Sequence, residues 1–196
     1  MSENYYTRHT LLAKVKDQHD QKSWEDFTYY YQRYIHMVIL GLGVNPSEVD
    51  DLTQKVLLNL WEKLPEFQYQ PGKCKFRTWM NTVIRNITFN YFRSSSRYKK
   101  RLDNAAAEVE EDADMPDIYQ IAEENWKDHI SNLAWENIQE GLNESNRDCF
   151  LLFSEGLTAE EVAEKMAVKL NTAYVMRKRV IEKLSREIRR LEDELS

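Results

Sequence analysis

The sequence predicts an all-α protein made of two small helical domains, joined by an acidic flexible linker, with a helix-turn-helix in the C-terminal domain. Helix-forming Leu, Glu, Lys, Arg and Ala dominate, whereas Gly and Pro number only five and four among 196 residues. Apolar residues recur at helical spacing in both halves of the chain. Between the halves lies an acidic stretch that is too poor in apolar residues to fold alone, which predicts a linker.

The domain boundaries follow from this acidic stretch, residues 103–117, which also contains Pro116. We predict an N-terminal domain over residues 1–98, a linker over 99–125 and a C-terminal domain over 126–196.

Composition excludes several classes of protein. No segment approaches the roughly eighteen consecutive apolar residues of a membrane span, so no membrane insertion is expected. The N-terminus lacks the apolar core and cleavage site of a secretory signal, which predicts a cytoplasmic protein. Cys74 and Cys149 lie in different predicted domains, and the four His show no ligand spacing. We therefore expect no disulfide framework, no metal site and no cofactor.

Three helices are predicted in the N-terminal domain. The first ends at Gly41, and its apolar stripe consists of Trp24, Phe27, Tyr31, Tyr34, Ile35 and Val38. The second begins with an Asn45 cap and Pro46 at the first helical position, and it stops at Pro65. Its apolar face consists of Val49, Leu52, Val56, Leu57, Leu60, Trp61 and Leu64. The third helix runs over residues 76–91, with its apolar stripe inward.

The third helix belongs to a segment, residues 67–102, that contains nine Lys and Arg and no acidic residue, although the whole chain has a net charge of −6. Cations neutralise phosphates, and aromatic side chains, which are frequent here, stack on unpaired bases. Asn residues on a helix surface disfavour the helix and suggest hydrogen bonds to bases or phosphates. A basic amphipathic core helix with a solvated face remains the alternative. The candidate DNA-binding residues are Lys73, Lys75, Arg77, Asn81, Arg85, Asn86, Asn90 and Arg93.

In the C-terminal domain the segment GLTAEEVAEKMAVKLNTAYVMRKRVIEKL predicts a helix-turn-helix. Thr158 and Glu161 form a capping box, and residues 167–169 form the turn. A recognition helix presents short polar and basic side chains to the major groove while its back is apolar. The alternative is an ordinary helical hairpin. The candidate residues on the outer face are Thr172, Tyr174, Arg177, Lys178 and Arg179.

Family resemblance comes from the same residues. The run from Asp51 to Arg93 resembles the core-binding and promoter-melting domain of bacterial sigma factors, more narrowly of the extracytoplasmic-function group. The matching residues are Asp51, Leu52, Gln54, Val56, Phe76, Arg77, Trp79, Arg85 and Asn86. The runs GLTAEEVAEKM and TAYVMRKRVIEKL are similar to the promoter-reading helix-turn-helix of that family. The two motifs occur in the family's order.

The resemblance implies a transcription initiation factor, not an enzyme, that binds core RNA polymerase and promoter DNA. Asp50, Asp51 and Gln54 are implied to contact the clamp of the β′ subunit, and the β subunit is a further implied partner. The basic residues 73–93 are implied to bind and open the minus-ten element. The recognition helix is implied to read the minus-thirty-five element. The resemblance leaves open whether an anti-sigma factor binds.

Some residues depart from the family pattern. Lys55 stands where Glu is frequent, on the face implied to meet the clamp, and Cys74 stands where Gly is common in the melting loop. Ala167 and Lys169 replace the usual turn Gly and Ser cap, so Lys169 gives the recognition helix no side-chain cap.

Two other classes of protein share part of this pattern. A helix-turn-helix regulator that binds duplex DNA without polymerase would not need the surface at Asp51 and Gln54 or the aromatic-rich basic segment. A helical nuclease would use Glu48, Asp50 and Asp51 with a divalent metal. Adjacent helical residues point about 100° apart, and no His accompanies these carboxylates, so they predict an exposed acidic face.

Overall fold

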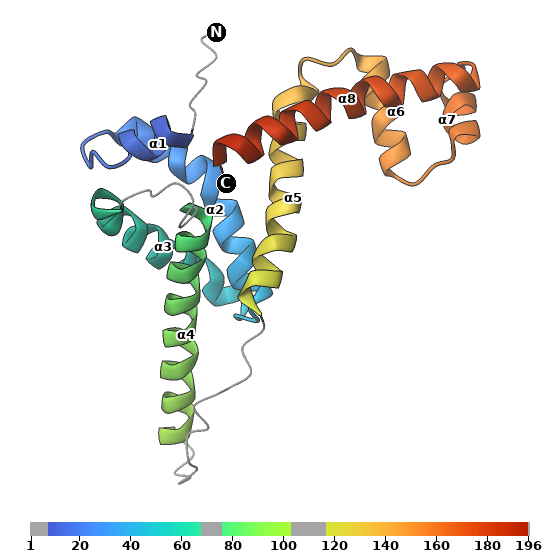
Figure 1. The fold of residues 1–196 in the computed structure, drawn as a ribbon. Helices are drawn as coiled ribbons and strands as arrows, with labels where there is room; N and C mark the ends of the chain where they lie inside the picture. The colour runs from blue at the N-terminus through green and yellow to red at the C-terminus, as the bar shows by residue number, and fades with distance from the viewer. Residues whose placement is uncertain (1–7, 68–75, 103–116, 196) are drawn as a thin grey trace. The chain divides into compact units, whose positions relative to one another are not determined.

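The computed structural model describes residues 8–67, 76–102 and 117–195 (Figure 1). The elements are α1 (Arg8–Lys14), α2 (Gln21–Gly41), α3 (Pro46–Lys63), the 3-10 helix η1 (Leu64–Glu66), α4 (Phe76–Leu102), α5 (Ile118–Gln139), α6 (Glu144–Ser154), α7 (Ala159–Lys165) and α8 (Leu170–Leu195). No described residue lies in a strand, which confirms the predicted all-α class. Within the described ranges no helix is both long and apolar enough to cross a membrane.

The chain forms two compact units, Met1–His129 with Glu194–Ser196, and Ile130–Asp193. Helix α5 belongs to both, because its residues 118–129 group with the first unit and its residues 130–139 with the second. The peptide that joins the two units therefore lies inside a helix.

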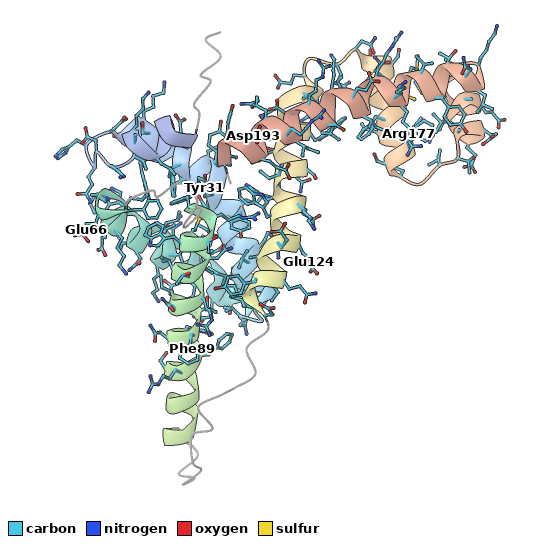
Figure 2. The ribbon with its side chains drawn as sticks, in the orientation of Figure 1. Tyr31, Glu66, Phe89, Glu124, Arg177 and Asp193 are labelled. Atoms are coloured by element: carbon cyan, nitrogen blue, oxygen red, sulfur yellow. The ribbon has the colours of Figure 1, made fainter. Side chains whose placement is uncertain are left out.

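In the first unit α2, α3 and α4 contact one another through their apolar faces. The side chains of Asp20 and Asn45 cap α2 and α3 by accepting hydrogen bonds from backbone N–H groups, and Pro46 opens α3 as predicted. Tyr31, labelled in Figure 2, is buried, and its hydroxyl donates to the Leu195 carbonyl at 3.1 Å. The buried side chains include Phe27, Tyr31, Tyr34, Ile35, Ile39, Val49, Leu52, Val56, Leu60, Phe76, Met80 and Ile84.

The structure differs from the predicted linker over residues 99–125. Helix α4 extends to Leu102, and α5 begins at Ile118. The early start has a packing reason: Ile118 and Ala122 lie one turn apart on the face that also bears Trp126, and all three are buried. The linker prediction relied on the acidic composition of this region and did not take into account the short apolar stripe of Ile118, Ala122 and Trp126.

In the second unit α7 and α8 lie on either side of the predicted turn at residues 167–169. Ala167 has a φ of 52°, a left-handed conformation that favours glycine, the residue usual there in the family that this segment resembles. The capping box is confirmed, because Thr158 accepts from the Glu161 N–H while the Glu161 carboxylate accepts from the Thr158 N–H at 2.7 Å. The core joins Cys149 of α6, Val162 and Ala163 of α7 and Ala173 of α8.

We expect Thr158→Ala to lower the free energy of unfolding of the second unit by about 1 kcal/mol, because α7 loses its N-terminal cap. Thr158→Ser keeps the hydroxyl and is the matched control. The measurement is urea unfolding of the full chain, followed by the Val162 methyl resonance. Equal midpoints for Thr158→Ala and the wild type would show that the capping box does not stabilise this unit.

Candidate nucleic-acid interface

Helix α4 provides the basic face. Its inner side is fixed by Phe76, Met80 and Ile84, which are fully buried. Four of the candidate residues are exposed, namely Arg85, Asn86, Asn90 and Arg93. Asn86, Asn90 and Arg93 follow one another at intervals of four and three residues, so they share one side of the helix. The four exposed residues Arg85, Asn86, Asn90 and Arg93 are hereafter called the open basic face.

The open basic face has no internal counter-charge. Among the ion pairs between described residues, none involves Arg85 or Arg93. The two guanidinium groups are therefore available to donate hydrogen bonds to phosphates and base acceptors, and the two amides can both donate to and accept from base edges.

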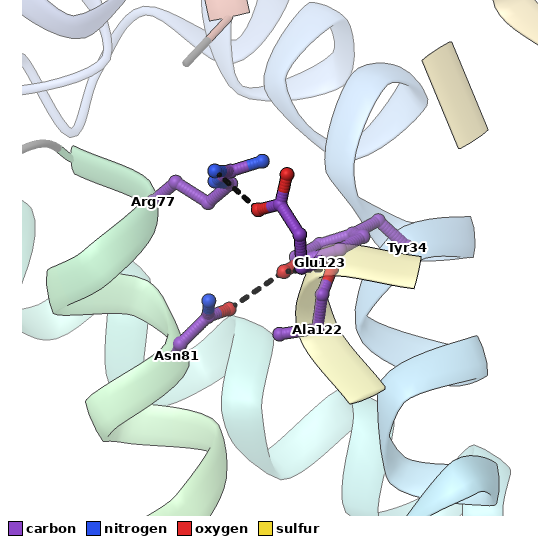
Figure 3. Close-up of polar contacts among 5 residues, drawn as sticks. All are labelled: Tyr34, Arg77, Asn81, Ala122 and Glu123. Atoms are coloured by element: carbon purple, nitrogen blue, oxygen red, sulfur yellow. Dashed lines mark hydrogen bonds and ion pairs between the residues drawn. The ribbon is translucent and has the colours of Figure 1, made fainter. Parts of the chain in front are cut away.

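Arg77 and Asn81, two turns and one turn before Arg85, are placed differently (Figure 3). The Arg77 guanidinium donates to the Glu123 carboxylate of α5 at 2.9 Å and lies 4.9 Å from the centre of the Trp126 ring. Its side chain is only 17% exposed. The prediction that Arg77 faces DNA is thus not met in this conformation, because α5 covers it.

Asn81 requires the same correction. It is 6% exposed, and its side-chain oxygen accepts a hydrogen bond from the Tyr34 hydroxyl at 2.8 Å. Burial raises the pKa of Tyr34 to about 12, although the hydrogen bond with Asn81 opposes this, so the hydroxyl remains a donor. The same hydroxyl lies 3.4 Å from the Ala122 carbonyl. Asn81 therefore fills a polar position inside the unit and is no surface group in this conformation.

The aromatic residues that suggested base stacking are partly core residues. Phe76 is fully buried, and the half-buried Trp79 packs 4.6 Å from Phe67 and 5.6 Å from Phe76, between ring centres. Phe89, labelled in Figure 2, is half-buried. Lys73 and Lys75, the remaining candidates of this segment, lie outside the described residues.

Helix α3 bears the predicted polymerase-binding residues. Asp50, Asp51 and Gln54 are all exposed. Asp50 lies 3.1 Å from His36 of α2, and Asp51 is paired with Lys55, the residue that departs from the family pattern. Two of the three predicted groups thus already have partners on the protein surface.

Gln54 lies in a groove of about 370 Å³ between α2 and α3. Leu58, which is 56% exposed, lies there too. Sequence reasoning missed Leu58, although an apolar residue outside the periodic stripe of α3 was the available signal. The groove residues are Trp24, Thr28, Gln32, Gln54, Leu57, Leu58 and Trp61. Exposed apolar side chains beside amides suit the side of a partner helix.

The candidate residues of α8 differ in exposure. Tyr174, Arg177, Lys178 and Arg179 are exposed, and Thr172 is half-buried. The Arg177 guanidinium lies 4.7 Å from the centre of the Phe153 ring, so it also packs within its unit. The Lys178 ammonium lies 3.9 Å from Glu182, at a side-chain exposure of 77%. At that exposure the pair leaves Lys178 free to exchange partners.

The described residues can be compared with the alternative of a metal-dependent nuclease. Glu48, Asp50 and Asp51 are exposed, and no three His, Cys, Asp or Glu side chains within the described ranges are grouped so as to hold a metal ion.

Residues 29–98 match the family described as Sigma-70 region 2. The matched segment contains most of α2, the whole of α3 and most of α4. It includes the open basic face and all groove residues except Trp24 and Thr28. No curated protein matches the chain. The matched segment, 70 of the 196 residues, supports a relationship of this part of the chain to the sigma factor family.

Proposed function

We propose that the chain is a sigma factor of the extracytoplasmic-function group, which acts in the cytoplasm, binds core RNA polymerase and opens promoter DNA. The observation that carries the proposal is that the Sigma-70 region 2 match coincides with a segment bearing two separate exposed surfaces. One surface is an apolar and amide-lined groove, and the other is a basic and amide-bearing helix face.

In this proposal residues 1–98 bind polymerase and melt the minus-ten element, and residues 126–196 read the minus-thirty-five element. The groove and the neighbouring Asp50, Asp51 and Gln54 receive the β′ clamp. The open basic face follows the DNA strand. Tyr174, Lys178 and Arg179 of α8 face the duplex, with Arg177 contributing to both packing and DNA contact.

The defining experiment is reconstituted transcription with bacterial core RNA polymerase and a library of genomic fragments. We expect promoter-dependent transcripts only when the chain is present. A protein that binds duplex DNA alone but yields no transcript with core polymerase would be a helix-turn-helix regulator instead.

We expect Leu58→Asp to weaken binding to core polymerase by about 2 kcal/mol, roughly 30-fold in Kd, because a central apolar contact is replaced by a charge. Leu40→Asp, at an exposed leucine of α2 outside the groove, is the matched control and should bind normally. The measurement is a titration of labelled chain with core polymerase, with circular dichroism to verify folding. An unchanged Kd for Leu58→Asp would exclude the groove.

We expect Asn86→Ala and Arg85→Ala to reduce open-complex formation about tenfold each on a duplex promoter, since each removes a contact to the opened strand. On a template already mismatched at the minus-ten element the loss should be smaller. Thr82→Ala, at an exposed position of the same helix, is the control. Permanganate footprinting measures the opening. Equal losses on both templates would contradict a role in melting.

For α8 we expect two different signatures. Lys178→Ala should cost about 1–3 kcal/mol and relax specificity at one base pair, as removal of a base contact does. Arg179→Ala should weaken all sequences alike and lower the salt slope by about one, as removal of a phosphate contact does. The titration uses the full chain and duplexes selected from a randomised library. Unchanged affinity in both variants would mean that another face reads the duplex.

A further inference from the structure

The first part of α5 packs on the first unit through a continuous stripe. Ile118, Ala122, Trp126 and His129 follow at intervals of four, four and three residues, and all are buried. The Trp126 ring meets the Tyr34 ring edge-on, with 5.1 Å between centres. His129 Nε2 lies 2.7 Å from the Tyr30 carbonyl, and burial lowers the pKa of this imidazole, so the neutral ring donates to that carbonyl.

This stripe brings an acidic side chain onto the basic helix. Glu123 accepts from Arg77 at 2.9 Å, and the Ala122 carbonyl lies beside the Tyr34 hydroxyl that donates to Asn81 (Figure 3). The Trp126 ring covers the Arg77 guanidinium at 4.9 Å. A carboxylate that accepts from a guanidinium presents the same charge and the same planar acceptor pair as a phosphate. Glu123 thus occupies the site on Arg77 that a DNA phosphate would take.

We propose that residues 118–129 are an autoinhibitory strap, which covers Arg77 and Asn81 of α4 in the free protein and leaves them when core polymerase binds. The inference rests on the proposed function, because it needs α4 to be the DNA-binding helix. It divides the basic helix into a covered part, Arg77 and Asn81, and the open basic face, which remains available for first contact with DNA.

Two variants are designed to loosen the strap without altering a proposed DNA contact. Glu123→Gln removes the carboxylate charge on Arg77. Gly41→Ala adds a methyl group at the end of α2, where a Cβ would lie 2.8 Å from Cγ2 of Ile121. Because Cγ2 is fixed to the branched Cβ of Ile121, the overlap is relieved most readily by movement of α5 itself.

Each variant has a matched control. Glu124→Gln removes the same charge from the next residue of α5, whose carboxylate accepts from Gln120 of its own helix (Figure 2 labels Glu124). Gly141→Ala makes the same glycine-to-alanine change where the added Cβ has only an ordinary contact, 3.6 Å from the Ile138 carbonyl.

The first measurement is the affinity of the free full chain for a short single-stranded oligonucleotide of mixed sequence. We expect Glu123→Gln to raise it about two- to fivefold, the range of an exposed ion pair. Gly41→Ala should raise it at least about fivefold and speed amide exchange over residues 118–129 similarly. The controls should match the wild type. Faster exchange without any gain in DNA affinity would overturn the inference.

The second measurement repeats the comparison with core polymerase bound. If the strap has already left in the initiation complex, wild type and variants should open a promoter equally. A gain that persists with polymerase bound would show that the strap stays docked there, and would overturn its release. Failure of the wild type to initiate with core polymerase would instead overturn the proposed function, which keeps the two failures distinct.

Discussion

Tyr34 is the residue on which the arrangement of three helices depends. Its side chain is fully buried in α2, and a buried hydroxyl without a partner costs about 1–3 kcal/mol. Asn81 of α4 and the Ala122 carbonyl of α5 lie 2.8 and 3.4 Å from it. The ring also packs against Trp126. One tyrosine therefore fixes which turn of α4 meets α2 and the position of α5 along both helices.

This constraint also sets where two oppositely charged segments of the sequence meet within the described residues. Residues 67–102 are basic throughout, and residues 103–128 contain ten acidic side chains. Between the described parts of these segments the ion pair is that of Arg77 with Glu123, at the level of α4 that Tyr34 selects. Arg85 and Arg93 lie further along α4 and are exposed, so the positive potential of their guanidinium groups extends into solvent.

Local signals in the sequence predicted the helices and the capped starts at Asn45 and Thr158, because a cap and an apolar stripe depend on residues within a few positions of one another. The exposure of Arg85 and Asn86 was predicted for the same reason. The groove beside Leu58 and the start of α5 at Ile118 were not, since both depend on helices that are distant in sequence. Acidic residues such as Glu123 and Glu124 led to the prediction of a linker where the first turns of α5 are packed.

Asn81 and Asn86 show why the helical pattern alone cannot decide whether a polar residue is exposed or buried. Periodicity identifies one apolar face and assigns every polar residue opposite to it to solvent. That assignment holds for a helix packed on one side, and it holds for Asn86, which is exposed. Helix α4 is packed on a second side by α5, and Asn81 lies there, buried and bonded to Tyr34. A buried amide is tolerated only when its partner is also present. The informative signal was therefore the tyrosine in the apolar stripe of α2, whose hydroxyl required a polar partner within the core.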